Sequence, residues 1–286
     1  MTANSRIDPC SSLGVLVADR PARAELFERL GLEYCCGGRQ SLTEACATRG
    51  LDLDAVSGML AALDAQHVQS MSVEDTDWRQ AGAAALCAHI VTVHHDGLRE
   101  AFPRLERLLS TVVRVHADRE PRLRDVEHLF REIRAGLEPH LASEENELFP
   151  ACIAAERTGT PVAERLLEEH ESEHLELGHA LVALRILCDG YDHQTAMCNT
   201  HRALLEALEA FEHDLHRHVH EENNVLLPAA RAGQRPDSAA APDRADTLPT
   251  CCDGWIAERT HAWVVERHAR RGLTGRSDNP QGTWLR

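Results

Sequence analysis

Apolar residues recur every three or four positions along most of the chain between residues 79 and 231, a spacing typical of amphipathic helices. The pattern breaks near Arg119–Pro121, Thr158–Pro161 and Asp189–Asp192, which divides the stretch into four helical segments. Joins this short make consecutive helices run in opposite directions. The pattern therefore predicts an all-α fold built around an antiparallel four-helix bundle at residues 79–231.

The chain before the bundle is expected to form a small helical domain at residues 1–75. Its helical patterns are short and are interrupted by glycine and aspartate, as at Pro21–Leu30 and Leu53–Leu63. One helix start is marked by the string Ser41-Leu-Thr-Glu44. This is a capping box, in which the serine and glutamate side chains satisfy free backbone donors at the helix N-terminus.

The chain after the bundle has a different composition. Residues 232–250 are rich in proline, alanine, aspartate and serine, which predicts a flexible linker. The remaining tail contains the pair Cys251-Cys252 and one short helical pattern at Trp255–Arg271. Residues 232–286 are therefore expected to be a C-terminal extension of the bundle, and the sequence assigns it no role.

Histidine and glutamate occupy positions on the apolar stripes of the four helices, where leucine would be expected. The string His140-Leu-Ala-Ser-Glu144 is matched by His218-Val-His-Glu-Glu222, and both are followed by Asn, Leu and Pro at the same offsets. The two strings start 78 residues apart, and the stripe residues His95 and His174 are 79 residues apart. The chain thus repeats a helix pair, and each pair contributes one histidine and then one His-x-x-x-Glu.

This repeat predicts a metal centre inside the bundle. Residues four apart lie on one face of a helix, so each histidine and its glutamate point toward a common centre. Two buried carboxylates without a counter-charge would cost several kcal/mol each, and two metal cations remove that cost. Imidazole and carboxylate together suit iron, manganese or zinc, and a carboxylate-bridged iron pair within four helices is a known arrangement. The predicted ligands are His95, His140, Glu144, His174, His218 and Glu222.

Counting donors leads to a specific hypothesis for two non-haem iron ions. The two glutamates bridge the irons, and the histidines of each helix pair bind one iron, His95 with His140 and His174 with His218. An oxo or hydroxo bridge between the irons leaves an open coordination position on each octahedral ion. Nitric oxide, dioxygen or a peroxide could bind there.

Net charge and cysteine content restrict the partners and the location. The chain has 286 residues, with 30 basic and 46 acidic side chains and a formal charge of −16, which argues against nucleic acid and anionic membranes as partners. The sequence has no apolar run near the roughly 20 residues of a membrane span and no leader-like start, so a cytoplasmic location is expected. Its ten cysteines include no C-x-x-C pair, which disfavours a thiolate zinc ribbon.

The remaining histidines carry weaker signals. His170 lies one turn before His174 on the same face, and it could be a third ligand, a donor to a ligand or a polar core residue. Histidines that lie off the apolar stripes are expected to face solvent. These are His94, His213, His216 and His220.

Several strings in the chain resemble one known family. Residues 79–231 resemble a hemerythrin-like di-iron domain, and an N-terminal string contains Cys35-Cys36-Gly37-Gly38. With these two features together, the chain resembles the repair-of-iron-centres (RIC) family over roughly residues 10–231. Other matching strings are Arg114-Val-His-Ala-Asp118, Glu171-Ser-Glu-His174 and Glu222-Asn-Asn-Val-Leu-Leu-Pro228.

The resemblance implies a function and a set of residue roles. RIC proteins repair iron–sulfur clusters after nitrosative or oxidative stress, so damaged iron–sulfur proteins and nitric oxide or oxygen species become expected partners, and a homodimer is expected. The family's metal ligands fall on the same six residues that the repeat indicates. Glu173 matches the family's acid just before a ligand, which implies a residue that contacts a ligand or lines a channel. The family's acid one turn before His140 is replaced by Gly136, with Glu138 on another face.

The adjacent thiols Cys35 and Cys36 have two interpretations. A disulfide between neighbours would close a strained eight-membered ring, so two thiols are expected at rest. They could accept a nitrosyl group, undergo redox chemistry or handle iron, facing the di-iron site of a partner subunit. Alternatively, they close a helix, and Gly37 and Gly38 supply a left-handed turn. For Cys251-Cys252 no family match supports a functional interpretation.

Four functions remain open at this point. Repair of iron–sulfur clusters is favoured, with the iron pair either donating iron or binding and reducing nitric oxide. A hemerythrin-like protein that binds or senses oxygen or nitric oxide is the alternative, and the 232–286 extension suits a sensor. A catalytic di-iron oxidase or nitric oxide reductase is a third. A structural zinc bundle is disfavoured, because six ligands exceed the four that zinc usually takes.

Overall fold

The computed structural model describes residues 7–67 and 77–234 of the chain. Every regular element in these two ranges is a helix, and the one β-type contact is an isolated bridge between Ser12 and Ser41. The all-α prediction is therefore confirmed. The predicted linker beyond residue 234, the helical pattern Trp255–Arg271 and the pair Cys251-Cys252 lie outside the described residues.

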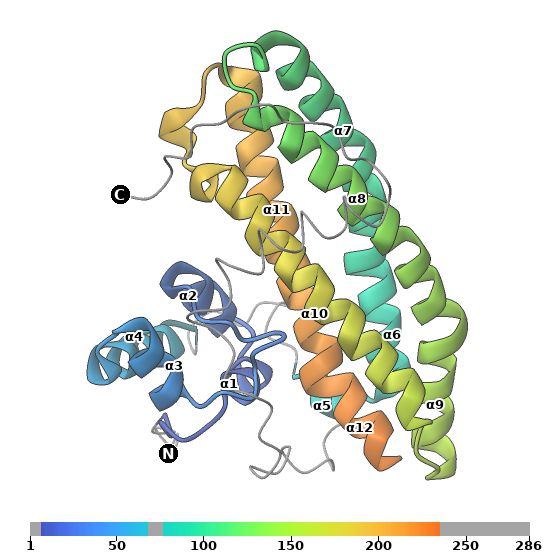
Figure 1. The fold of residues 1–286 in the computed structure, drawn as a ribbon. Helices are drawn as coiled ribbons and strands as arrows, with labels where there is room; N and C mark the ends of the chain where they lie inside the picture. Colours follow the sequence, from blue (N-terminus) through green and yellow to red (C-terminus); the bar gives the residue numbers. More distant parts are fainter. Residues whose placement is uncertain (1–6, 68–76, 235–286) are drawn as a thin grey trace, which may run out of the picture. The chain divides into compact units, whose positions relative to one another are not determined.

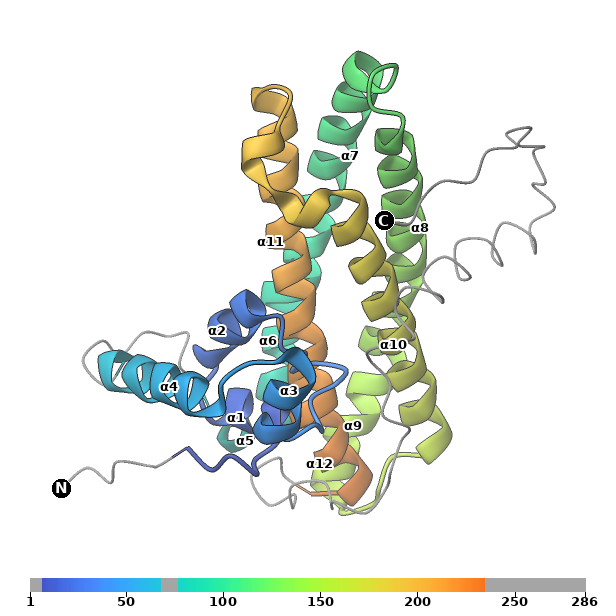
Figure 2. The same cartoon turned by 60° about the vertical axis from the view of Figure 1, so that its left-hand side comes forward.

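Four long helices form the bundle and run alternately up and down (Figures 1 and 2). The first consists of α6 (Ala83–His89), η2 (Ile90–His95) and α7 (Asp96–His116). The second consists of α8 (Arg122–Ser143), η3 (Glu144–Leu148) and α9 (Phe149–Thr158). The third is α10 (Glu164–Leu187), and the fourth consists of α11 (Asn199–Glu221), η6 (Glu222–Leu226) and α12 (Leu227–Ala232). Two short 3₁₀ turns, η4 (Asp189–Tyr191) and η5 (His193–Thr195), join the third to the fourth.

Three of the long helices widen into a π-turn, which periodicity did not predict. In η3 the backbone N–H of Phe149 donates to the carbonyl of Glu144, five residues earlier. In η6 the N–H of Leu227 donates to the carbonyl of Glu222 in the same way. Such turns are rare and occur frequently at functional sites. Both predicted bridging glutamates therefore stand at the first position of a π-turn.

Apolar layers enclose the predicted ligands along the bundle. On one side the buried rings of Phe102 and Phe130 both pack against Phe211, with ring centroids 6.2 and 5.6 Å from it. The other side is filled by buried aliphatic and aromatic side chains. This layer contains Ile90, Leu148, Phe149, Leu167 and Leu226. Water is thereby kept from the polar side chains between the two layers, where electrostatic interactions are strong.

The N-terminal segment forms four helices with an apolar core of its own. They are α1 (Leu13–Asp19), α2 (Arg23–Leu30), α3 (Leu42–Arg49) and α4 (Leu53–His67), and Phe27, Leu42 and Leu60 are fully buried between them. A buried Arg23–Asp64 ion pair joins α2 to α4, with Nη2 and Oδ2 2.6 Å apart. The predicted capping box at the start of α3 is present. A short helix, α5 (Trp78–Ala81), then leads into the bundle.

Two glycines allow this segment to approach α11 and η6 closely. A Cβ on Gly14 would lie 2.1 Å from Oδ1 of Asn224, and one on Gly38 would lie 2.6 Å from the same atom. Asn224 in turn donates from Nδ2 to the carbonyl of Cys35 at 3.1 Å. The interface therefore requires these positions to lack a side chain.

No helix in the described ranges is both long enough and apolar enough to cross a lipid bilayer.

Candidate metal centre

The six predicted ligands meet at one buried point between the four long helices. All are largely or fully buried, and the exposed fraction is zero for His95, Glu144, His218 and Glu222. Their donor atoms fall into two groups that share both glutamates. One group consists of His95, His218, Glu144 and Glu222, and the other of His140, His174, Glu144 and Glu222.

The predicted pairing of histidines within each helix pair was wrong. His95 and His218 lie together, with their Nε2 atoms 3.2 Å apart, and the rings of His140 and His174 have centroids 5.0 Å apart. The physical reason is the packing at the level of the site, because η2, which carries His95, packs on α11, which carries His218, and α8 packs along α10. Each candidate ion would therefore take histidines from both halves of the repeat.

Both glutamates contact histidines of the two groups. Glu144 lies 2.8 Å from Nε2 of His140 through Oε1 and 3.3 Å from Nε2 of His95 through Oε2. Glu222 lies 3.0 Å from Nε2 of His174 through Oε2 and 3.2 Å from Nε2 of His218 through Oε1. In each carboxylate one oxygen faces one group and the second oxygen faces the other, which is the geometry of a bridging ligand.

Outer hydrogen bonds orient three of the four imidazoles. Nδ1 of His95 lies 2.8 Å from Glu145 Oε1, and Nδ1 of His140 lies 2.7 Å from Glu173 Oε2. Nδ1 of His174 lies 2.8 Å from Oδ1 of Asn223. An Nδ1–H that donates to these oxygens leaves the lone pair of Nε2 directed into the site, as metal-binding histidines require. Sequence reasoning found Glu173 but missed the other two.

Polar atoms at this point need a partner that the described part of the chain does not supply. Buried atoms without a hydrogen-bond partner among the described residues include Nε2 of His140 and His174, both oxygens of Glu144, and Oε2 of Glu222. Burying such atoms unpaired is costly. Cations bound by imidazole nitrogen and carboxylate oxygen would satisfy all of them. The donor set therefore fits a pair of metal ions.

The electrostatics of the site also favour ionised carboxylates. Burial alone disfavours the charged form of Glu144, but close contacts with the imidazoles of His140, His174 and His95 outweigh burial and hold the pKa of Glu144 well below its usual range. Burial also disfavours the charged form of His140, but its contacts with Glu144 and Glu173 outweigh burial and raise the pKa of His140 to about 9. Without metal, the two carboxylates are thus ionised and the imidazoles beside them hold protons, which metal ions would displace.

Comparisons with known proteins agree with this site. Residues 87–230 match the family model described as "Hemerythrin HHE cation binding domain". Residues 10–64 match a model described as "Domain of Unknown function (DUF542)".

Relatives match over nearly their whole length. The chain is 34% identical over 223 residues to the iron–sulfur cluster repair protein YtfE of Pectobacterium atrosepticum, covering 78% of this chain and 97% of that protein. It is 35% identical over 220 residues to the YtfE of Edwardsiella ictaluri, covering 76% and 95%. It is 32% identical over 222 residues to that of Escherichia coli, covering 78% and 97%. The chain belongs to the YtfE family of iron–sulfur cluster repair proteins. The resemblance to the repair-of-iron-centres family is therefore confirmed, and the hemerythrin HHE domain of the family implies binding of non-haem iron.

The two thiols of the YtfE-family chain lie beside its own candidate metal centre. Sγ of Cys36 donates to the backbone carbonyl of His174 at 3.4 Å, and Sγ of Cys35 lies 4.0 Å from Sγ of Cys36. Both thiols are free. Gly37 and Gly38 do not have positive φ, so a left-handed turn does not explain them. The interpretation that they close a helix with such a turn was wrong, because the glycine at 38 serves a close packing contact instead.

Three histidines that were expected in solvent are buried. His216 and His220 are covered by Tyr34, whose ring packs edge-on against both with centroids 6.4 and 5.4 Å away. His94 packs under α11, with Nδ1 2.8 Å from Oδ1 of Asp214. The prediction failed because the N-terminal segment and α11 cover the helix faces that carry these histidines. Helical periodicity identifies only the residues that face the bundle interior. His213 remains partly exposed and lies 3.6 Å from Oε2 of Glu28.

His170 and Gly136 lie outside the two groups of four. His170 donates from Nδ1 to the carbonyl of Leu166 at 2.9 Å, and its buried ring lies 5.6 Å from that of His140. A Cβ on Gly136 would meet no atom of the described residues within 4 Å. Glu138 points to the surface, where it lies 2.8 Å from Nη2 of Arg134. Neither residue 136 nor residue 138 therefore replaces the acid that the family has one turn before His140.

Proposed function

We propose that this protein restores iron–sulfur clusters damaged by nitrosative or oxidative stress. The observation that carries the proposal is the convergence of all six ligand candidates in a chain whose relatives are named iron–sulfur cluster repair proteins. Its partners are then damaged iron–sulfur proteins and nitric oxide or oxygen species. We further propose that it acts in the cytoplasm as a homodimer.

The same geometry supports a dinuclear iron centre. Two imidazoles and two bridging carboxylates would hold each ion, with His95 and His218 on one and His140 and His174 on the other. When bound, two non-haem irons would supply exchangeable metal and redox chemistry toward nitric oxide or oxygen species. The chain itself holds the carboxylates ionised, directs the imidazoles inward and excludes water by means of the apolar layers.

A repair assay tests the proposed function. Iron-loaded protein is incubated with an enzyme whose iron–sulfur cluster has been damaged by nitric oxide, and the recovered enzyme activity is measured. We expect recovery with the wild type and background recovery with His218→Ala, because Nε2 of His218 lies 3.2 Å from Glu222 and from His95.

Two outcomes would contradict this proposal. The first is a His218→Ala variant that loses its iron and still repairs as well as the wild type. The second is a wild type that binds nitric oxide at its iron and restores no activity. That second outcome would favour the alternative, a protein that binds or senses oxygen or nitric oxide. The 232–286 extension would also suit a sensor.

We propose that Cys35 and Cys36 take part in repair by handling iron or nitric oxide leaving the centre. Support comes from the thiol of Cys36, which contacts the backbone of His174, a candidate ligand. The double substitution to serine is expected to lower the repair rate at least tenfold while leaving the iron content unchanged, because no ligand is altered. Substitution of the exposed Cys10 to serine is the control and should change neither. Full repair by the double variant would remove the thiols from the mechanism.

A further inference from the structure

A second cluster of metal-binding side chains lies next to the candidate dinuclear centre. Nε2 of His89 is 3.4 Å from Oε1 of Glu221, and Nε2 of His94 is 3.7 Å from Oε2 of the same carboxylate. The donor atoms of these three residues all lie within 4.8 Å of one another. They come from α6, η2 and α11, and the function proposed above uses none of them.

A π-turn brings the two histidines onto one face. In an α-helix, residues five apart are rotated by about 140° around the axis, so His89 and His94 would diverge. The turn η2 between them is closed by i→i+5 hydrogen bonds, such as that from the N–H of Asp96 to the carbonyl of Val91. This wider turn places a residue nearly above the one five positions earlier. Glu221, the last residue of α11, faces both rings.

The cluster has the same features that mark the dinuclear centre. Nδ1 of His94 lies 2.8 Å from Asp214 Oδ1, so an outer carboxylate orients this ring as Glu145 and Glu173 orient two of the ligand candidates. Within the described part of the chain, Nε2 of His94 and Oε2 of Glu221 are buried and have no hydrogen-bond partner. His94 itself is 3% exposed.

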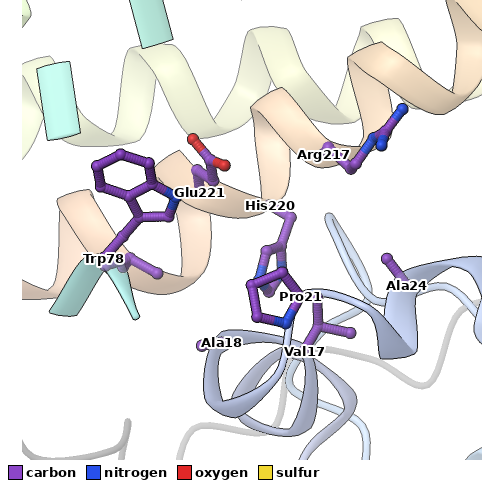
Figure 3. Close-up of a pocket in the computed structure, with 9 residues that line it drawn as sticks. Val17, Ala18, Pro21, Ala24, Trp78, Arg217, His220 and Glu221 are labelled. Carbon is purple, nitrogen blue, oxygen red and sulfur yellow. The ribbon is translucent and has the colours of Figure 1, made fainter. Parts of the chain in front are cut away.

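An ion could reach this cluster from a surface pocket. Trp78, Arg217 and Glu221 line the pocket, where Figure 3 shows the Glu221 side chain near the indole. The Trp78 ring also stacks on His89, with ring centroids 4.0 Å apart. The side chains of His89 and Glu221 are 22% and 14% exposed, so the cluster borders on solvent.

We propose that His89, His94 and Glu221 bind a third metal ion, a single divalent first-row transition metal such as Fe²⁺. Two imidazoles and one carboxylate are a common ligand set for such ions, and three protein ligands leave coordination positions open for water or an exchanging ligand. The His94 ring is nearly parallel to that of His218, with centroids 5.6 Å apart, so the ion would bind beside the dinuclear centre. This site does not depend on the proposed repair function.

A proton is the competing occupant of the cluster. Burial lowers the pKa of His94, but its contacts with Asp214 and Glu221 outweigh burial and raise the pKa to about 9. A protonated His94 between two carboxylates would be a simple ion-pair network. Direct measurement of metal binding distinguishes a bound metal ion from a bound proton.

Metal titration of the full-length protein tests the proposal, with Co²⁺ as the probe. Metal-free wild type is expected to bind three Co²⁺ per chain at equilibrium, and Glu221→Gln and His89→Gln are each expected to bind two. The third equivalent should quench the fluorescence of Trp78 in a background where the other three tryptophans are phenylalanine. His193→Gln is the matched control, because its imidazole lies 3.2 Å from Glu209 Oε2 in a similar surface pair. The control should still bind three ions.

The two variants also separate this inference from the proposed dinuclear centre. Retention of two ions in both shows that the bundle is folded and that the dinuclear centre is intact. A wild type that binds only two ions, a third ion that persists in either variant, or loss of all metal from both variants would overturn the inference. If His218→Ala loses the first two ions but metal still quenches Trp78, the third site binds its ion independently of the dinuclear centre.

Discussion

Glu144→Gln is expected to reduce the iron bound at the candidate dinuclear centre from two ions per chain to fewer than one, measured in a Glu221→Gln background that lacks the proposed third site. Glu144 lies within 3.5 Å of imidazole nitrogens from His95, His140 and His174. An amide cannot bridge two cations as an anionic carboxylate does, so both candidate ions would lose a ligand at once. Iron content after reconstitution and desalting measures the effect.

Thermal unfolding gives a second measurement of the same substitution. A ligand present at 1,000 times its Kd stabilises the folded state by about 4 kcal/mol. Removal of metal with a chelator should therefore lower the melting temperature of the wild type much more than that of Glu144→Gln. Glu147→Gln is the control, because Glu147 is exposed on the same π-turn. A Glu144→Gln protein with two tightly bound irons would contradict the bridging role.

Arg185→Ala is expected to destabilise the metal-free protein by about 3 kcal/mol, because it leaves a buried carboxylate without its counter-charge. Glu212 on α11 is 1% exposed and lies 2.6 Å from Nη2 of Arg185 on α10. A second contact joins Nε of Arg185 to Oε1 of Glu212 at 3.1 Å. Urea unfolding in the presence of a chelator measures the loss without the contribution of bound metal.

Two further variants identify the cause of that loss. Arg122→Ala removes an arginine from an exposed pair with Asp189, 3.0 Å apart, and should cost less than about 1 kcal/mol. Adding Glu212→Gln to Arg185→Ala should restore most of the stability, because the unpaired charge is gone. Equal losses for Arg185→Ala and Arg122→Ala would show that burial of Glu212 is unimportant.

Helix positions and the set of ligand candidates could be predicted from the sequence because both depend on local spacing. Apolar residues at helical intervals locate the four long helices, and the pattern breaks agree with the ends at His116, Thr158 and Leu187. The i, i+4 spacing of His140 and Glu144 places them on one face whatever the bundle does.

Two of the three π-turns described, η3 and η6, had a signal in the sequence that helical periodicity does not detect. Proline follows each of the two predicted bridging glutamates by six residues, at Pro150 and Pro228. A proline has no N–H to donate, and its ring clashes with the carbonyl four residues earlier. A wider turn just before the proline relieves both problems, and the structure has η3 and η6 there.

The sequence by itself determined the helices, the repeat and which six side chains carry the donors, since these follow from the periodicity of one chain segment at a time. Tertiary structure alone decided which histidines lie together. The repeat relates His95 to His174 and His140 to His218, and the predicted and the observed pairings obey that relation equally well. Only the packing of η2 on α11 and of α8 on α10 selects one. Contacts between distant segments likewise buried His94 and placed Cys36 against His174, because no local spacing specifies what covers the outer face of a helix.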